Sequence, residues 1–128
     1  MMTLALWCVL VAGLLPYAGT AAAKWGFKRY DNNNPRDWLA GQTGFRARGN
    51  AAQANSFETF PLFAAAVLVA TLLKAPQAWL DTLAAGYVLV RLGYLYCYVS
   101  DRASLRSLCW LIGQILSVAI FLLALLKT

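Results

Sequence analysis

The sequence predicts an all-α integral membrane protein that folds as a four-helix bundle, and three observations carry this prediction. Apolar residues make up 61% of the 128 residues and charged residues only 12%, which is about half the ~25% usual in soluble proteins. Four apolar segments each approach the ~20 residues that a helix needs to cross a bilayer. Because backbone groups in lipid must be satisfied within the segment, we expect all four segments to be helices.

The predicted helices belong to a single domain, 1–128, and cover approximately residues 3–23, 51–73, 76–98 and 107–126. The first segment has a rival interpretation as a signal peptide, since small residues end its apolar run. However, no positive charge precedes the run, and the run is long, so we expect a retained helix. Lys74-Ala75-Pro76 predicts a tight turn between the second and third helices.

The distribution of positive charge predicts the orientation in the membrane. Loop 24–50 carries six Lys and Arg residues and loop 99–106 carries two, whereas the second connection carries only Lys74 and the C-terminus only Lys127. Positive charge is retained on the cytoplasmic side. Both basic loops are therefore predicted to be cytoplasmic and both termini to lie outside, in a multi-pass protein.

Composition also argues against two other classes of protein. The net charge of +6 comes from short loops beside apolar segments rather than from a basic face, so we expect no nucleic-acid partner. The chain has no histidine, and Cys8, Cys97 and Cys109 are scattered through apolar segments without a CxxC pair. This pattern predicts neither a metal site nor a disulfide framework, and we interpret the cysteines as small apolar side chains.

Glu58 is the only glutamate, and it lies just before the uncharged run 59–73. A carboxylate at this depth is costly, so it is expected to face the protein interior and meet a partner. Arg91 also lies within an apolar segment, and Glu58 is its obvious candidate anion. Such a pair could serve packing alone. Alternatively, the surplus positive charges of Arg48 and Arg106 could join the same space and attract a small anionic ligand.

Helical spacing groups further polar side chains with Glu58 and with Arg91. Residues spaced by three, four or seven lie on one face of a helix. One predicted face on the second helix holds Arg48, Asn55 and Glu58, and one on the third holds Tyr87, Arg91, Tyr94 and Tyr98.

The segment from Phe45 to Phe63 resembles the signature of the MAPEG family, membrane-associated proteins in eicosanoid and glutathione metabolism. The likeness is carried there by Arg48, Ala52, Asn55, Glu58 and Pro61. The third predicted helix and the start of the fourth are also similar to the family, through Arg91, Tyr94, Tyr98, Leu105, Arg106 and Ser107. These two stretches contain the matching motifs. The length, the four spans and the orientation also match, so the likeness extends over nearly the whole chain.

This resemblance implies a homotrimer of a bacterial type, placed in the bacterial inner membrane, with glutathione bound between neighbouring subunits near the cytoplasmic side. The residues that would hold glutathione are Arg48, Asn55, Glu58, Arg91, Tyr94 and Tyr98. Arg106, with Ser107, would lie near the sulfur as the catalytic group, and Lys24 is a looser match to a basic residue that approaches the thiol from the adjacent subunit.

The function implied is that of a glutathione-dependent transferase or peroxidase acting on lipophilic small molecules that enter from membrane lipid, with glutathione as co-substrate and no metal. A guanidinium beside a thiol favours the reactive thiolate. Many family members have arginine at the position of Ala51 and some have it at the position of Ala54, so a non-catalytic lipid-binding or scaffolding relative is the main alternative. A small multidrug exporter is a third, but that family places its acid in the first helix, and here the first predicted helix has none.

Overall fold

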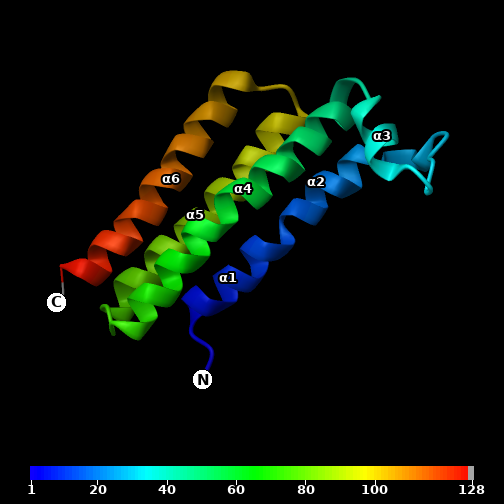
Figure 1. The fold of residues 1–128 in the computed structure, drawn as a ribbon. Helices are drawn as coiled ribbons and strands as arrows, with labels where there is room; N and C mark the ends of the chain where they lie inside the picture. Colours follow the sequence, from blue (N-terminus) through cyan, green and yellow to red (C-terminus); the bar gives the residue numbers. More distant parts are fainter. Residues whose placement is uncertain (127–128) are drawn as a thin grey trace.

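Four long apolar helices run side by side in the computed structural model, which describes residues 1–126 (Figure 1). The elements are α1 (Leu4–Leu14), α2 (Pro16–Ala23), the 3₁₀ turn η1 (Trp25–Phe27), α3 (Pro35–Ala40), α4 (Gly44–Leu72), α5 (Gln77–Val99) and α6 (Ala103–Leu125). Within the described residues, four helical stretches are long and apolar enough to cross a membrane, the first being α1 and α2 together with η1. The predicted all-α fold with four candidate membrane spans is confirmed.

Two helices begin earlier than the apolar runs alone indicated. Helix α4 begins at Gly44 rather than at 51, and α6 begins at Ala103 rather than at 107. With 29 residues, α4 is about 43 Å long at 1.5 Å per residue, longer than the ~30 Å of hydrocarbon. Its basic first turns therefore extend beyond the apolar layer, and the expected loop 24–50 is shorter. Lys127, used above to orient the chain, lies outside the described residues.

The first membrane span changes direction at Pro16, where α1 ends and α2 begins. Proline has no backbone N–H to donate and its ring crowds the preceding turn, so it kinks a continuous helix. Helix α1 packs mainly on α5, whereas α2 packs mainly on α4. The kink thus moves the second half of this span from one central helix to the other.

Two glycines allow α2 and α4 to cross at close range. A Cβ on Gly49 would lie 2.9 Å from both the Ala23 nitrogen and the Gly19 carbonyl oxygen. A Cβ on Gly19 would lie 2.8 Å from the Gly49 carbonyl oxygen. Only hydrogen fits at both positions, as is common where membrane helices pack tightly. This crossing explains why the polar start of α4 is helical outside the apolar run.

The turns after α4 and α5 use the same local geometry. Lys74 and Asp101 adopt left-handed backbone angles, with φ of 54° and 62°. The next residue in each turn donates its backbone N–H back to the helix, from Ala75 to the Ala70 carbonyl at 2.9 Å and from Arg102 to the Cys97 carbonyl at 2.8 Å. These are the 6→1 bonds of a Schellman motif, which caps the last carbonyls and reverses the chain. The predicted tight turn at Lys74-Ala75-Pro76 is therefore present.

The core lies in the half of the bundle that contains the α4–α5 turn. Phe63 of α4 and Tyr87 of α5 are stacked there with ring centroids 3.8 Å apart, and both are fully buried. Small side chains of α1, including Ala5 and Ala12, pack against this layer. Tyr87, which spacing placed with the polar face of α5, thus belongs to the apolar core.

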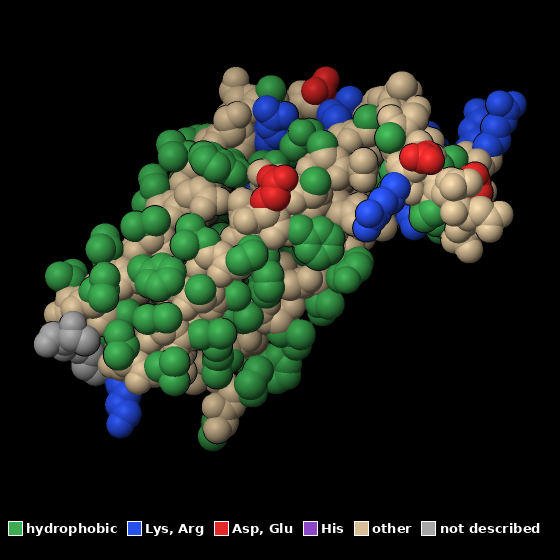
Figure 2. Space-filling model, in the orientation of Figure 1, with side chains coloured by type: hydrophobic (Ala, Val, Ile, Leu, Met, Phe, Trp, Pro, Cys, Tyr) green, Lys and Arg blue, Asp and Glu red, His purple; other side chains and the backbone are tan. Residues whose placement is uncertain are grey.

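Charged side chains gather at the opposite end, around α3 and the α5–α6 turn, while apolar side chains cover the visible flank of the bundle (Figure 2). The N-terminus, the α4–α5 turn and the end of α6 lie together at the other end (Figure 1). A bundle whose sides are apolar and whose charges lie mostly at one end matches a bilayer and its water boundary. The candidate site lies toward the charged end.

Candidate functional site

A polar cavity of about 280 Å³ opens between α4, α5 and α6. It is lined by Asn55, Tyr94, Tyr98, Arg106, Ser107 and Trp110. Five of these six residues are among those that the sequence singled out, and they come from three different helices. The cavity size is close to the lower end of the ~300–1,000 Å³ usual for small-molecule sites.

Arg91 lies behind the Asn55 wall of this cavity and is only 2% exposed. Its Nη2 donates hydrogen bonds to Asn55 Oδ1 at 3.0 Å and to Ser56 Oγ at 3.1 Å. Its Cζ lies 3.9 Å from the centre of the Tyr94 ring. Arg91 therefore fixes the Asn55 amide and one tyrosine of the lining while remaining covered itself.

The charge of Arg91 is not neutralised in the way the sequence suggested. The expected ion pair with Glu58 is wrong, because no salt bridge joins the two residues within 1–126 and Arg91 is bonded to neutral side chains instead. The Arg91 Nη1 atom is buried without a hydrogen-bond partner among the described residues. Burying a guanidinium without an anion is costly, so an external anion close to this wall would stabilise the site.

The Glu58 side chain is exposed. Three residues after Asn55, it is displaced by about 60° around the helix axis at 3.6 residues per turn, which moves its side chain from the cavity wall toward the outer side of α4. It remains within electrostatic range of Tyr94. Glu58 thus lies at the margin of the cavity rather than behind it.

Arg48 does not line the cavity. Its Nε donates a hydrogen bond to the Val99 carbonyl oxygen at 3.1 Å, joining α4 to the last residue of α5. A cation at a helix C-terminus also interacts favourably with the helix dipole. The three residues predicted to share a face of α4 therefore lie in different places. Arg48 contacts the end of α5, Asn55 lines the cavity, and Glu58 lies at the cavity margin.

Aromatic rings and guanidinium groups alternate along the α5 side of the cavity. Tyr94 and Tyr98 meet edge to face with centroids 5.6 Å apart, and the Arg106 Cζ lies 4.6 Å from the centre of the Tyr98 ring. With Arg91 over Tyr94, each tyrosine has one cation on its face, an arrangement that orders both partners. Arg106 is held beside the cavity by this contact and is only partly buried.

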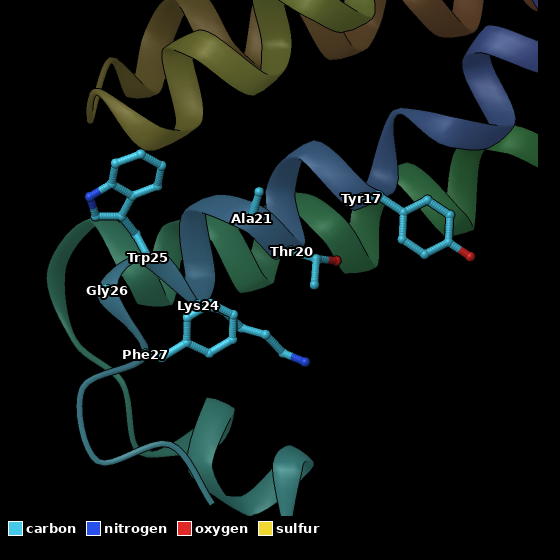
Figure 3. Close-up of a pocket in the computed structure, with 7 residues that line it drawn as sticks. All are labelled: Tyr17, Thr20, Ala21, Lys24, Trp25, Gly26 and Phe27. Carbon is cyan, nitrogen blue, oxygen red and sulfur yellow. The ribbon is translucent and has the colours of Figure 1, made fainter. Parts of the chain in front are cut away.

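Two residues of the site were missed in the sequence. Trp110 lines the cavity, and its position four residues after Arg106 on the same helix face was an available signal. Ser56 also binds Arg91, but a single serine hydroxyl next to Asn55 gave little indication of this role in the sequence. Conversely, Lys24 lines a different cavity, formed by α2 and η1 (Figure 3).

Chemically, the cavity presents an amide, two phenols, a hydroxyl and a guanidinium, with a second guanidinium behind the amide. Such a set can bind a polar anionic molecule and stabilise negative charge. Within residues 1–126, no group of three or more His, Cys, Asp or Glu side chains is placed to hold a metal ion. An indole beside the polar groups supplies an apolar wall.

These features define a helical membrane protein with a polar cavity between three of its spans. A family model described as the MAPEG family matches residues 4–126. The chain belongs to this family, and the resemblance inferred from its motifs is confirmed. No curated protein matches the chain.

Proposed function

We propose that the protein binds glutathione in the α4–α5–α6 cavity and uses its sulfur to attack lipophilic electrophiles or peroxides. The observation that carries this proposal is the buried Arg91, which has no carboxylate partner among the described residues and is bonded to Asn55 of the cavity wall. Together with Arg106 it forms an excess of positive charge around a small polar cavity. Glutathione, with two carboxylates, one ammonium group and a thiol, has complementary chemistry.

The residues take distinct roles in this function. Asn55, Tyr94 and Tyr98 bind the amides and carboxylates of glutathione, and Arg91 positions Asn55 while supplying long-range attraction. Glu58, at the margin, receives the ammonium group. Arg48 keeps the end of α5 in place through its bond to the Val99 carbonyl.

Arg106, with Ser107 beside it, holds the sulfur. A free thiol has a pKa near ~8.5 and is mostly protonated at neutral pH, and an adjacent guanidinium favours the thiolate. The thiolate electron pair forms a bond to an electrophilic carbon while the leaving group departs with its own pair. With a hydroperoxide, two glutathione molecules give the disulfide, an alcohol and water. The indole of Trp110 gives the cavity an apolar wall, which suits a lipophilic substrate that enters from the bilayer.

We also propose that the functional form is a homotrimer in which neighbouring copies cover the outer side of α4. Glu58 and Phe57 are both exposed there, within a stretch long and apolar enough to span the membrane. An acidic side chain facing lipid is costly, whereas one facing a neighbouring subunit can be paired. Native mass spectrometry tests this through the mass of the complex, which should be three times 14.0 kDa, and a monomer would contradict it.

We propose that the charged end faces the cytoplasm and that both termini face outward, in a bacterial inner membrane. The shared position of α3 and the α5–α6 turn at one end (Figure 1) supports a common side for both basic loops. The test is labelling of single cysteines at Arg36 and Thr3 in intact cells with a membrane-impermeant maleimide. We expect only the Thr3→Cys chain to react, and the reverse pattern would contradict this orientation.

A second candidate function is a non-catalytic lipid-binding or scaffolding protein. It is favoured by Ala51, where many family members carry an arginine, and by Ala54, where some do. The two functions differ in one observable: only the enzyme converts bound glutathione to its thiolate at neutral pH.

A further inference from the structure

Two cysteines lie opposite each other where α6 packs against α5. The described residues contain three free cysteines, Cys8, Cys97 and Cys109. Cys8 belongs to the apolar core of the bundle, in agreement with the interpretation from sequence. Cys97 of α5 and Cys109 of α6 lie near the turn that joins these two helices, and their thiols interact directly across the helix pair. The fold therefore brings together two thiols that appear only as scattered residues in the sequence.

The line of contact that holds these thiols, the α5–α6 seam, is unusually close because α5 contributes glycines to it. A Cβ on Gly93 would lie 3.5 Å from Cys109 Sγ. A Cβ on Gly86, seven residues earlier, would lie 3.6 Å from the Leu116 side chain, which is seven residues after Cys109. Cys97 follows Gly93 by about one helical turn and thus shares its face. A disulfide needs Cα atoms within ~7 Å, a separation that only closely packed helices offer.

The seam is separate from the candidate glutathione cavity. Neither cysteine lines that cavity, although Cys97 directly precedes Tyr98 and Cys109 follows Arg106 by three residues. Adjacent residues differ by about 100° around a helix axis, so Cys97 and Tyr98 face different sides of α5. Cys97 is only 7% exposed, whereas Cys109 is partly exposed. One thiol of the pair is therefore accessible from outside and the other is covered.

The surroundings of Cys109 suit an apolar oxidant. Cys109 lies within a membrane-spanning stretch, and Leu105 and Ile112, one helical turn before and after it, are both exposed. A thiol in such apolar surroundings is protonated at rest, so a reagent reaches it through hydrocarbon rather than through water. The Arg91 guanidinium lies within electrostatic range of Cys109 and stabilises the negative charge that develops on the sulfur as it reacts.

We propose that Cys97 and Cys109 form a reversible disulfide when the protein meets a lipid hydroperoxide. The Cys109 sulfur attacks the terminal peroxide oxygen and the O–O bond breaks. The lipid oxygen takes the thiol proton and leaves as an alcohol, and Cys109 becomes a sulfenic acid. The Cys97 sulfur then attacks the Cys109 sulfur, the S–O bond breaks, and the hydroxyl group leaves with the Cys97 proton as water. One hydroperoxide is thereby reduced while two thiols are oxidised to a disulfide.

The pair returns to the dithiol by thiol–disulfide exchange, in which two molecules of an external thiol are oxidised to their own disulfide. Thiols facing the cytoplasm are kept reduced, and disulfides there are transient and catalytic or redox-sensing. The α5–α6 turn lies at the charged end that we assign to the cytoplasm. This cycle uses no residue of the glutathione cavity lining, so it does not depend on the function proposed above.

Mass spectrometry of the full detergent-purified chain tests the proposal with no glutathione present. The reduced protein is treated with one equivalent of linoleic acid hydroperoxide, then denatured and alkylated with N-ethylmaleimide. We expect a single maleimide per chain instead of three, restoration of all three by dithiothreitol, and a peptide that links Cys97 to Cys109. Labelling of all three thiols after the hydroperoxide treatment would overturn the proposal, and so would disulfides between chains.

Single substitutions assign the two roles. In Cys97→Ala the sulfenic acid on Cys109 should persist and be trapped by dimedone, whereas in Cys109→Ala the Cys97 thiol should stay reduced. Cys8→Ala is the matched control, because Cys8 is as buried as Cys97 but lies in the core, and it should form the disulfide as the wild type does. Loss of the disulfide in Cys8→Ala, or a disulfide in Cys97→Ala, would contradict the assignment. Because glutathione takes no part, failure of this test leaves the glutathione site unaffected.

Discussion

Arg91 of α5 donates a hydrogen bond from Nη2 to the Asn55 Oδ1 of α4 at 3.0 Å. This contact joins a buried guanidinium to the wall of the polar cavity and orients the amide of Asn55. It therefore links the packing of two membrane helices to the geometry of the candidate site. A substitution of either residue should therefore change both the stability of the bundle and its affinity for glutathione.

Asn55→Ala should lower both the stability of the bundle and its affinity for glutathione. The substitution leaves the buried Arg91 with one acceptor, Ser56, and a hydrogen bond to a charged group contributes about 1.5–3 kcal/mol. Unfolding in detergent and isothermal titration measure the two effects. Asn50→Ala, on the same helix but outside the cavity lining, is the control, and equal losses in both variants would contradict the role of the Arg91–Asn55 bond.

Arg106→Ala should abolish turnover while leaving assembly intact. The guanidinium is partly exposed at the cavity and packs on Tyr98, so its loss removes charge stabilisation more than packing. Removing one such group typically costs about 10²–10³ in rate, and Arg106→Lys should retain part of the activity. Arg102 lies in the preceding turn over the Tyr96 ring and away from the cavity, so Arg102→Ala is the matched control. Unchanged turnover in Arg106→Ala would remove this residue from the mechanism.

Glu58→Gln should weaken glutathione binding by roughly 10-fold or more, since the ammonium group of the ligand loses a charged partner worth about 1.5–3 kcal/mol. Titration of the wild-type and variant proteins with glutathione, and with a derivative acetylated on the amine, measures the effect. The acetylated ligand should bind both proteins equally. If the variant fails to assemble while glutathione still binds the folded remainder, Glu58 serves packing between subunits instead.

Gly49→Ala should destabilise the protein, whereas Gly86→Ala should not. A Cβ at Gly49 would meet backbone atoms of α2 at 2.9 Å, but one at Gly86 would meet only the Leu116 side chain at 3.6 Å. Overpacking costs about 1–3 kcal/mol, while alanine is favoured over glycine in a helix by up to ~1 kcal/mol. Thermal unfolding in detergent compares the two, and similar melting temperatures would refute the close α2–α4 crossing.

The sequence was sufficient to predict the membrane spans and most of the residues that line the cavity. Uninterrupted apolar runs have a strong physical signature, and helical spacing together with the family motifs selected Asn55, Tyr94, Tyr98 and Arg106, which the structure brings to one cavity. These residues are far apart in the chain, yet each lies on the inner face of its helix. Their proximity follows from packing three spans together.

The sequence was less informative about which side of α4 each polar residue faces. Glu58 and Asn55 differ by about 60° around the axis, so only the position of α5 decides that Asn55 meets Arg91 and Glu58 does not. Arg48 was grouped with Asn55 and Glu58 by helical spacing and the family motif, whereas its bond to the Val99 carbonyl depends on how α4 packs against the end of α5. The start of α4 at Gly44 was hidden in a polar stretch, and the close contact between Gly19 and Gly49 beside it is shown by no local pattern.

Reduced glutathione titrated into the detergent-purified protein is the most direct test of the proposed function, with the heat of binding and the near-ultraviolet thiolate absorbance recorded together. We predict saturable binding accompanied by thiolate formation at neutral pH, and loss of the thiolate signal in Arg106→Ala. Binding without thiolate would contradict the proposed role of Arg106. No binding at millimolar glutathione would contradict the glutathione site itself and favour the lipid-binding or scaffolding function.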